Sequence, residues 1–371
     1  MFLSFLRFSL DDNCPVPEHL DEMDWDGLLE FGMKQTIVGV LYHGLKRLEG
    51  RPERPDKYKI IEWYSANEEI VNDNRKLNRA SAKVTYLLYK KDGIKACVLK
   101  GQGNALMYPD PMMRTSGDID LWTSLTTDEL LSFVMRVSPE SGIEYHHIDF
   151  PVFDDAVTEI HIIPSFMGNL FYERRLKKYF EQVKAEQFRQ IVSLPEGAGK
   201  ICVPTDSFNR IFQLSHVMHH FFFEGVGLRQ IIDYYYLLRR GFTEEERAAD
   251  EQLLKRLNMH KFAAGLMWLL HDTLGLDERY LLVKPNEKVG RMLLDEVMKA
   301  GNFGHHDDRY HFKGLSVYTQ YFVEIYRNLH FAWQFPSETI WGRPVSRWYH
   351  MYYKWRLRRK ARILKQKGNE S

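Results

Sequence analysis

Residues 98–122 read VLKGQGNALMYPDPMMRTSGDIDLW, and this stretch decides the interpretation of the chain. Near its end Asp118 and Asp120 alternate with Ile119 and Leu121, a period of two that predicts a β-strand. Residues i and i+2 of a strand point to the same side, with Cα atoms about 6.6 Å apart. Two carboxylates held in this way can jointly bind a hard divalent cation, which prefers oxygen ligands. The pair therefore indicates the metal site of a phosphoryl-transfer enzyme.

Candidate phosphate-binding residues surround the two aspartates. Lys100 and Gly101 end a predicted strand and open a predicted helix, where backbone N–H groups can approach a phosphate. Arg114 precedes Asp118 by four residues and carries a forked guanidinium that can neutralise phosphate oxygens, and Ser116 can add a hydroxyl. An Asp-x-Asp pair alone is often no more than two solvated acids. Lys-Gly, Arg and Gly-Asp-Ile-Asp-Leu in this order favour a nucleotide site.

This stretch also resembles a known family. The uncharacterised bacterial nucleotidyltransferase family has motifs similar to Leu99-Lys-Gly101, Tyr108-Pro-Asp-Pro111, Arg114 and Gly117-Asp-Ile-Asp-Leu121. That family is part of the superfamily of DNA polymerase beta, and its nearer relatives include nucleotidyltransferase toxins of abortive-infection systems. The resemblance extends, less sharply, over about residues 80–238. One departure from the superfamily is Gln102, which stands where a second glycine or serine usually follows the first.

The resemblance implies a reaction and its cofactors. Asp118 and Asp120 would hold Mg²⁺ or Mn²⁺, and an acceptor hydroxyl would attack the α-phosphate of a nucleoside triphosphate such as ATP. A nucleoside monophosphate would be transferred and pyrophosphate would leave. The residues expected to bind the nucleotide are Lys100, Gly101, Arg114 and Ser116. The acceptor stays open between a sugar, another small molecule, tRNA and a protein side chain.

Members of the superfamily carry a third carboxylate on a neighbouring strand. Its best match is Glu159 within VTEIHI, residues 157–162, where Glu159 and His161 share one face of a predicted strand. Glu159 is expected to be a third metal ligand or the base that deprotonates the acceptor hydroxyl. His161 is expected to assist Glu159 or to orient it.

Two further groups are weaker candidates for substrate contact. His216 and His220 are spaced like the histidines of a zinc helix, but the glutamate that would act as base is missing. They are expected to lie in the core or to line a pocket, from which His220 could reach the substrate. Arg229 enters a predicted helix one turn before Asp233, and the spacing suggests that the two side chains pair. A helix start is the favoured role of Arg229, and closing the nucleotide pocket is the alternative.

The fold class is predicted to be α+β, with a small mixed-sheet nucleotidyltransferase core between N-terminal and C-terminal helical segments. The strands are expected at 94–99, 118–122, 144–150 and 156–163. The helices are expected at 58–91 (one helix or two joined end to end), 126–137, 207–223, 228–239, 244–257, 262–274, 288–299 and 318–367, the last with a break at 342–344. Thr126, followed by Asp128 and Glu129, is typical of the N-cap of the helix expected at 126–137. The predicted segments are an N-terminal helical segment 1–79, the core 80–195, a C-terminal helical domain 196–342 and a basic helical tail 343–371.

Charge is distributed unevenly along the chain. The net charge is +1, but residues 343–371 hold ten Lys and Arg against one acid, or +9, which leaves 41 basic and 49 acidic residues, or −8, for the remainder. This tail interleaves tryptophan and tyrosine with its basic residues. That combination suits an RNA or DNA backbone and equally an anionic membrane surface. A third interpretation is a basic helix whose aromatic side chains pack on the protein.

Composition limits the other classes of function. The three cysteines, Cys14, Cys97 and Cys202, are odd in number and form no Cys-x-x-Cys pair, which argues against a disulfide framework and favours a reducing cytoplasm. Neither a secretory signal nor a run of about 20 apolar residues is present. The segment 301–314, rich in His and Asp, is more typical of a solvated loop than of a metal site. The alternatives to an enzyme are an inactive nucleotide- or partner-binding module and an RNA or membrane-surface binder acting through the tail.

Overall fold

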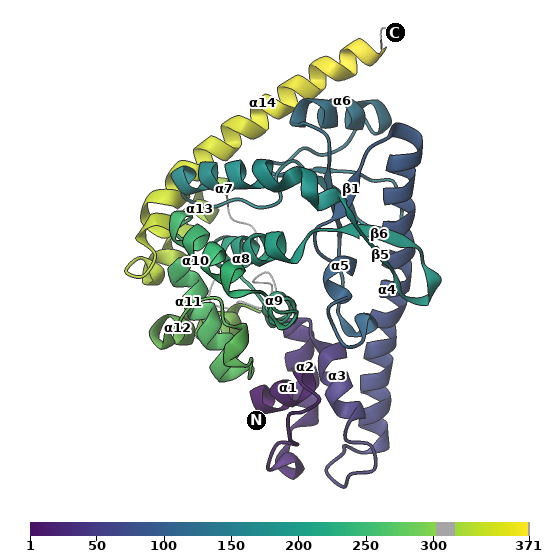
Figure 1. The fold of residues 1–371 in the computed structure, drawn as a ribbon, viewed down its shortest axis with the longest axis vertical. Helices are drawn as coiled ribbons and strands as arrows, with labels where there is room; N and C mark the ends of the chain where they lie inside the picture. Colours follow the sequence, from purple (N-terminus) through teal and green to yellow (C-terminus); the bar gives the residue numbers. More distant parts are fainter. Residues whose placement is uncertain (302–315, 370–371) are drawn as a thin grey trace. The chain divides into compact units, whose positions relative to one another are not determined.

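The computed structural model describes residues 1–301 and 316–369, and the segment 301–314 therefore lies almost wholly outside the described residues. The chain divides into two compact units, each built from three separate segments. The helical unit comprises Met1–Arg75, Asn104–Ser116 and the described part of Phe223–His311. The sheet unit comprises Lys76–Gly103, Gly117–Phe222 and the described part of Phe312–Ser371 (Figure 1). The four consecutive segments expected from the sequence stay a prediction.

The sheet unit is built on a four-stranded mixed sheet of order β1-β2-β4-β3. Its strands are β1 (Ala96–Val98), β2 (Ile119–Thr123), β3 (His147–Asp149) and β4 (Thr158–His161). The β2–β4 pair is parallel, and the β1–β2 and β3–β4 pairs are antiparallel. A separate antiparallel ribbon joins β5 (Gln190–Ser193) and β6 (Lys200–Val203). The predicted α+β class with a small mixed sheet is confirmed.

The alternation of apolar and polar residues explains why these strands form. One face of the sheet carries Ile119, Leu121, Ile148 and Ile160, all of them fully buried. The other face carries the polar members of the same strands, because successive strand residues point to opposite sides. All four predicted strands exist; β2 has the expected length but is shifted by one residue, and the other three are shorter than expected. Within 144–150 the chain turns back on itself, since the Glu144 N–H donates to the His147 carbonyl and Ile143 bridges Ile148.

The helices of the sheet unit follow the predicted pattern. Residues 57–92 form one continuous helix, α4 (Lys57–Asp92), whose second half belongs to this unit. The predicted N-cap Thr126 forms a capping box with Glu129 at the start of α6 (Thr127–Val137). The other helical elements that lie wholly or partly in this unit are α5 (Gln102–Ala105), α7 (Leu170–Val183), η3 (Lys184–Phe188), η4 (Pro195–Gly197), α8 (Asp206–Phe223), α13 (Val317–Asn328), η8 (Leu329–Phe331), η9 (Ser337–Gly342) and α14 (Arg343–Asn369).

The helical unit is predominantly α-helical. Its elements are α1 (Phe2–Leu10), η1 (Leu20–Glu22), α2 (Trp25–Gln35), α3 (Val38–Lys46), η2 (Pro111–Met113), α9 (Leu228–Arg239), α10 (Glu244–Arg256), α11 (His260–Trp268), η5 (Leu269–Thr273), η6 (Glu278–Tyr280) and α12 (Glu287–Ala300). The predicted helices at 228–239, 244–257 and 288–299 are confirmed within a residue or two. The helix predicted at 262–274 changes from α to a π turn at Leu269. Of the described helices, none has both the length and the apolar character needed to cross a membrane.

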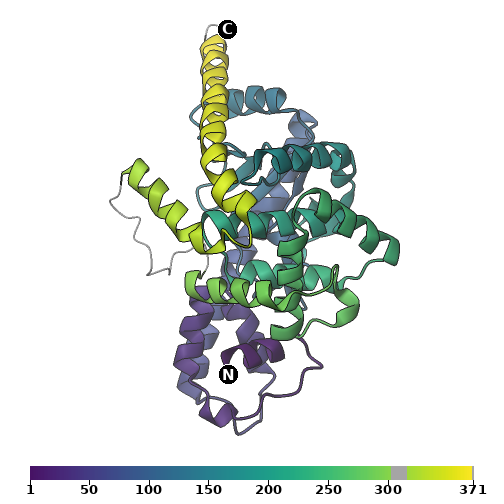
Figure 2. The ribbon, with the colours of Figure 1, turned by 90° about the vertical axis from the view of Figure 1, so that its left-hand side faces the viewer.

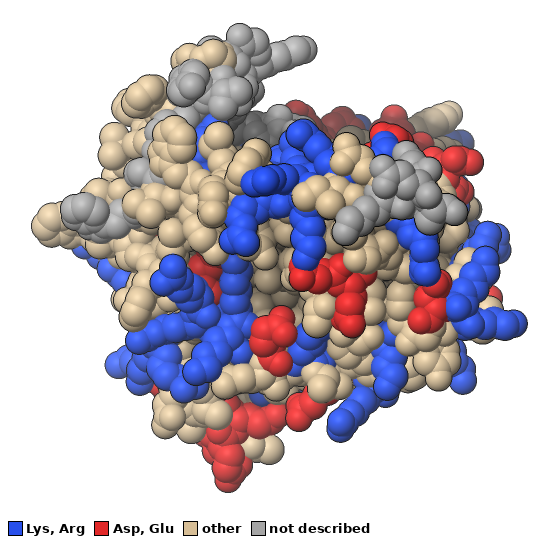
Figure 3. Space-filling view, turned by 90° about the horizontal axis from the view of Figure 1, so that it is seen from above, with Lys and Arg blue, Asp and Glu red and all other residues tan. Residues whose placement is uncertain are grey.

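The basic tail packs on the sheet unit as α14, which runs beside α6 (Figures 1 and 2). Lys360 lies 2.5 Å from Asp128 of α6, and Lys354 and Lys365 form ion pairs with Glu144 and Glu140. Leu357 and Ala361 are buried against the unit. On the face seen in Figure 3, Lys and Arg side chains lie beside Asp and Glu side chains and form no unbroken basic surface. The tail helix thus packs on the protein, with Tyr349 and Tyr353 against Tyr145. Trp348, Tyr352 and Trp355 are exposed, so contact of the tail with RNA or a membrane stays a prediction.

Candidate active site

The register of the mixed sheet brings the predicted carboxylates of two distant segments together. Asp120 of β2 lies directly opposite Glu159 of β4 in the parallel pair. Glu159 in turn lies opposite Asp149 of β3 in the antiparallel pair. Residues opposite each other in a ladder share one face of the sheet, so these three carboxylates form one row across three strands. His161 and His147 form the next row, two residues along the same strands.

Asp120 is the most tightly held of the three carboxylates. Its side chain is 7% exposed, with the Lys100 ammonium 3.0 Å from Oδ2 and His161 Nε2 2.7 Å from Oδ1. Burial by itself would raise the pKa of Asp120, but Lys100 and His161 outweigh burial and hold the pKa well below its ordinary value. Asp120 is therefore a carboxylate at neutral pH, and His161 donates to it. His161 was expected to assist or orient Glu159, and in this arrangement it contacts Asp120 at 2.7 Å.

Glu159 has the opposite electrostatic character. Burial, together with the neighbouring charges of Asp120 and Asp118, raises the pKa of Glu159 to about 7, against the lowering effects of His161 and Lys100. A carboxyl with this pKa exchanges its proton close to neutral pH, as a general base must. Glu159 therefore has the properties of the predicted base and lies where a third metal ligand would be needed.

Asp118 lies immediately before β2 and is exposed. The prediction placed Asp118 on the strand itself, and the strand begins one residue later. Its charge nevertheless acts on Glu159, as the raised pKa of that residue shows. Gly101 approaches the same point, since a Cβ at Gly101 would lie 3.4 Å from the Asp118 carbonyl oxygen. Gly101 has φ +56°, a left-handed conformation that glycine adopts without strain.

Helix α8 carries a stripe of side chains at every fourth residue: Phe208, Phe212, His216 and His220. Phe208 stacks on Trp122, which shares the sheet face of Asp120, with ring centroids 5.6 Å apart. His216 Nε2 lies 3.4 Å from Lys100 Nζ and 3.1 Å from His220 Nε2. Burial, together with the charge of Lys100, keeps the pKa of His216 well below 6.5, so His216 is neutral. Their position beside Lys100 agrees with the expected place in the core or along a pocket, and contact of His220 with the substrate stays a prediction.

The sequence reasoning missed two histidines. His146 and His147 stand at the turn of the 143–148 hairpin, where His147 Nδ1 lies 3.0 Å from His146 Nε2 and 3.3 Å from Glu159 Oε2. Burial lowers the pKa of His147 to about 4 and the pKa of His146 well below 6.5. A signal was present in the sequence, because His147-x-Asp149 has the same spacing of imidazole and carboxylate as Glu159-x-His161.

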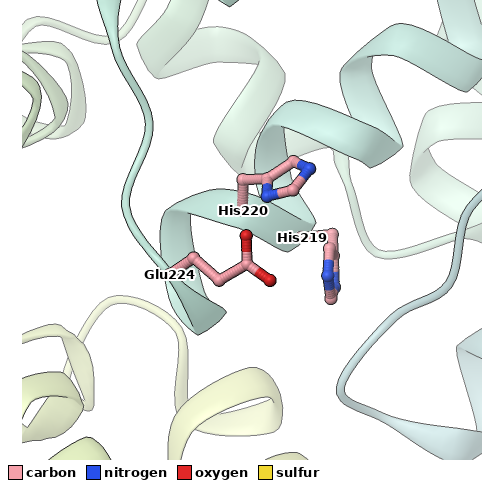
Figure 4. A group of neighbouring side chains, drawn as sticks. All are labelled: His219, His220 and Glu224. Atoms are coloured by element: carbon pink, nitrogen blue, oxygen red, sulfur yellow. The ribbon is translucent and has the colours of Figure 1, made fainter. Parts of the chain in front are cut away.

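Figure 4 shows another group of side chains with possible metal-ligand atoms at the end of α8, made of His219, His220 and Glu224. Their possible ligand atoms lie within 4.8 Å of one another. Glu224 comes directly after the helix, and the boundary between the two units falls between Phe222 and Phe223.

Three predicted site residues belong to the helical unit. Arg114 is buried and binds Asp233 of α9 through two parallel contacts of 2.7 Å, from Nε to Oδ1 and from Nη2 to Oδ2. Its Nη1 lies 3.2 Å from Ser116 Oγ, and Arg229 donates to the Thr115 carbonyl at 3.0 Å. Asp233, expected to pair with Arg229, thus accepts a bidentate ion pair from Arg114. This pairing favours a structural role for Arg114, and phosphate binding by Arg114 and Ser116 stays a prediction.

Comparison with known proteins adds the family. The model of a family described as uncharacterised nucleotidyltransferases matches residues 21–275, more than half of the chain. The chain belongs to this family. None of the curated proteins compared with it matches. Among solved structures, the crystal structure of an antigenic nucleotidyltransferase-like protein from Paracoccidioides brasiliensis is 12% identical, covers 59% of this chain and 97% of its own, and has a TM-score of 0.32. That score is too low for an argument about the site.

Proposed function

We propose that this member of the family transfers a nucleoside monophosphate from a nucleoside triphosphate to an acceptor hydroxyl. The observation that carries the proposal is the parallel β2–β4 register, which sets Asp120 opposite Glu159 with the charge of Asp118 beside them. Segments about 40 residues apart in sequence thus supply Asp120 and Glu159 to one place, and the charge of Asp118 acts on Glu159. On the sequence resemblance alone, we assign the chain to the bacterial members of the polymerase-beta superfamily.

The side chains present fit a hard divalent cation. Asp118, Asp120 and Glu159 offer oxygen ligands, and Asp120 is charged at neutral pH. Asp118 and Asp120 would hold Mg²⁺ or Mn²⁺, and Glu159 serves as the base. When bound, such an ion neutralises charge on the triphosphate and favours displacement at the α-phosphorus.

The remaining chemistry belongs to the residues of the sheet unit. Lys100 carries the positive charge closest to Asp120, and its neighbours His216 and His146 are neutral, so Lys100 is suited to a phosphate oxygen. Glu159 accepts the proton of the acceptor hydroxyl as the new oxygen–phosphorus bond forms. The bond from the α-phosphorus to the bridging oxygen breaks, and pyrophosphate leaves with that electron pair. His161 holds Asp120 in place through the 2.7 Å contact.

The test is transfer of label from α-³²P nucleoside triphosphates in the presence of Mg²⁺ or Mn²⁺, with sugar, tRNA, protein and small-molecule acceptors supplied in turn. Wild type is compared with Asp118→Asn and Asp120→Asn. The matched control is Asp295→Asn on α12, an exposed aspartate in a surface ion pair with Lys299. We expect both site variants to lose at least about 10³-fold of the rate, a typical effect of removing a charge-stabilising group, and the control to match wild type.

Two results would overturn the proposal. One is that wild type transfers no label to any acceptor while it still binds nucleotide, which would establish a binding module. The other is that both site variants transfer label as fast as the Asp295→Asn control.

A further inference from the structure

The carboxylate row on the sheet has an unfavourable feature that a bound cation would remove. Glu159 stands between two acids, Asp120 on β2 and Asp149 on β3, each directly opposite it in a ladder. Like charges directly opposite each other destabilise a sheet. Lys100 compensates Asp120 at 3.0 Å. On the Asp149 side, the imidazole of His147 faces both acids, 3.6 Å from Asp149 and 3.3 Å from Glu159, and the charge of Lys354 acts on Asp149.

The imidazole of His147 lies between the two acids. Its Nε2 lies 3.6 Å from Asp149 Oδ1, and its Nδ1 lies 3.3 Å from Glu159 Oε2. Nδ1 also lies 3.0 Å from His146 Nε2. A neighbouring side chain in contact with a metal-bound imidazole orients its ring.

The group is also compact and accessible. Ligand atoms of His147, Asp149 and Glu159 all lie within 4.8 Å of one another. The Asp149 side chain is 53% exposed, whereas that of His147 is 14% exposed. An ion can therefore enter from the Asp149 side and keep water molecules as further ligands, while the imidazole side is enclosed by protein.

We propose that His147, Asp149 and Glu159 form a second cation site, which binds a first-row divalent transition metal ion. Imidazole together with carboxylate suits Zn²⁺, Co²⁺ or Mn²⁺, whereas Mg²⁺ prefers oxygen ligands throughout. The site goes beyond the proposed function and shares only Glu159 with it. Because Glu159 also belongs to a compact group with Asp120 and His161, it stands between two cation sites on one sheet face.

The experiment is titration of the metal-stripped full chain with Co²⁺, followed by its visible ligand-field absorption, and with Zn²⁺, followed by calorimetry. His305, His306 and His311 are first replaced by glutamine, so that the histidine-rich segment cannot bind the ion. In this background we compare His147→Gln and Asp149→Asn with the control His260→Gln, a half-buried histidine on α11 of the helical unit. We expect the two site variants to bind at least about 10-fold more weakly, the low end of effects at metal sites, and the control to bind like the background.

Retained binding in His147→Gln, or binding of Zn²⁺ no tighter than Mg²⁺ in the background protein, would overturn the second site. If circular dichroism shows that His147→Gln fails to fold, metal binding by the milder variant Asp149→Asn decides the question. Asp118→Asn separates this proposal from the proposed function, since it should abolish nucleotidyl transfer and leave the Co²⁺ spectrum unchanged. Loss of the Co²⁺ spectrum in Asp118→Asn would place the ion at the carboxylate site and also overturn the proposal.

Discussion

Replacing Asp233 by alanine should destabilise the protein far more than an ordinary substitution. Asp233 and Arg114 are both buried and joined by two 2.7 Å contacts, and Asp233 also accepts from Tyr108 at 2.6 Å and from Asn104 at 3.0 Å. Although burial alone would raise the pKa of Asp233, Arg114 lowers it below 3.8, so the carboxylate is charged at pH 7. The Asp233→Ala change therefore leaves a buried guanidinium and two donors without their acceptor.

The magnitude follows from these contacts. Leaving one member of a buried ion pair without its partner costs about 3–5 kcal/mol, and a buried donor without an acceptor costs about 1–3 kcal/mol. Since the cavity left by alanine admits some relaxation, we expect a loss of about 5 kcal/mol in the free energy of unfolding. This is comparable to the whole stability of many domains, which is about 5–15 kcal/mol.

The assay is urea unfolding at pH 7, followed by circular dichroism and tryptophan fluorescence, with Asp295→Asn as the surface control. The double variant Arg114→Met/Asp233→Leu removes both charges and should recover about 3 kcal/mol of the loss, because no unpaired charge remains. A loss below about 1.5 kcal/mol in Asp233→Ala, or no recovery in the double variant, would refute the reasoning. Nucleotidyl transfer by the folded double variant then reports whether Arg114 also binds phosphate.

Two further predictions concern the pH profile and the tail. The logarithm of kcat/KM for transfer should rise with a slope of one up to about pH 7 and level off above it. The reason is that Glu159, whose pKa is about 7, must lose its proton before it can accept another. Glu159→Gln should abolish the rising part of the profile, and a flat wild-type profile between pH 5 and 8 would exclude Glu159 as the base. Leu357→Ala on the buried side of α14 should lower the free energy of unfolding by about 2–4 kcal/mol. Arg359→Ala, at an exposed position of the same helix, should change it by less than about 0.5 kcal/mol. Equal effects of the two substitutions in urea unfolding would mean that α14 is not packed on the sheet unit.

Local patterns in the sequence were sufficient for the elements that depend on near neighbours. The period of the apolar residues predicted the long helix that became α4, and the capping residues at Thr126 and Glu129 predicted the start of α6. The alternation around Asp120 predicted β2, and Glu159-x-His161 predicted a second polar strand face. Residues three to four apart on a helix, or two apart on a strand, share a face wherever the element lies in the protein. Family membership rests on motifs of the same local kind.

Pairing between distant segments was decided by the tertiary structure. No local pattern places His147 against Glu159, or Arg114 against Asp233, 119 residues further along the chain. The first contact depends on strand order and on register, because a slip of one residue would turn the side chains of a strand to the opposite face. The second depends on the packing of α9 beside the end of η2. The basic tail shows the same limit, because its composition suited RNA, a membrane and packing equally well. The sequence by itself determined which residue types stand at the candidate positions. The tertiary structure determined which of them contact one another, because burial and register act between segments that are distant in the sequence.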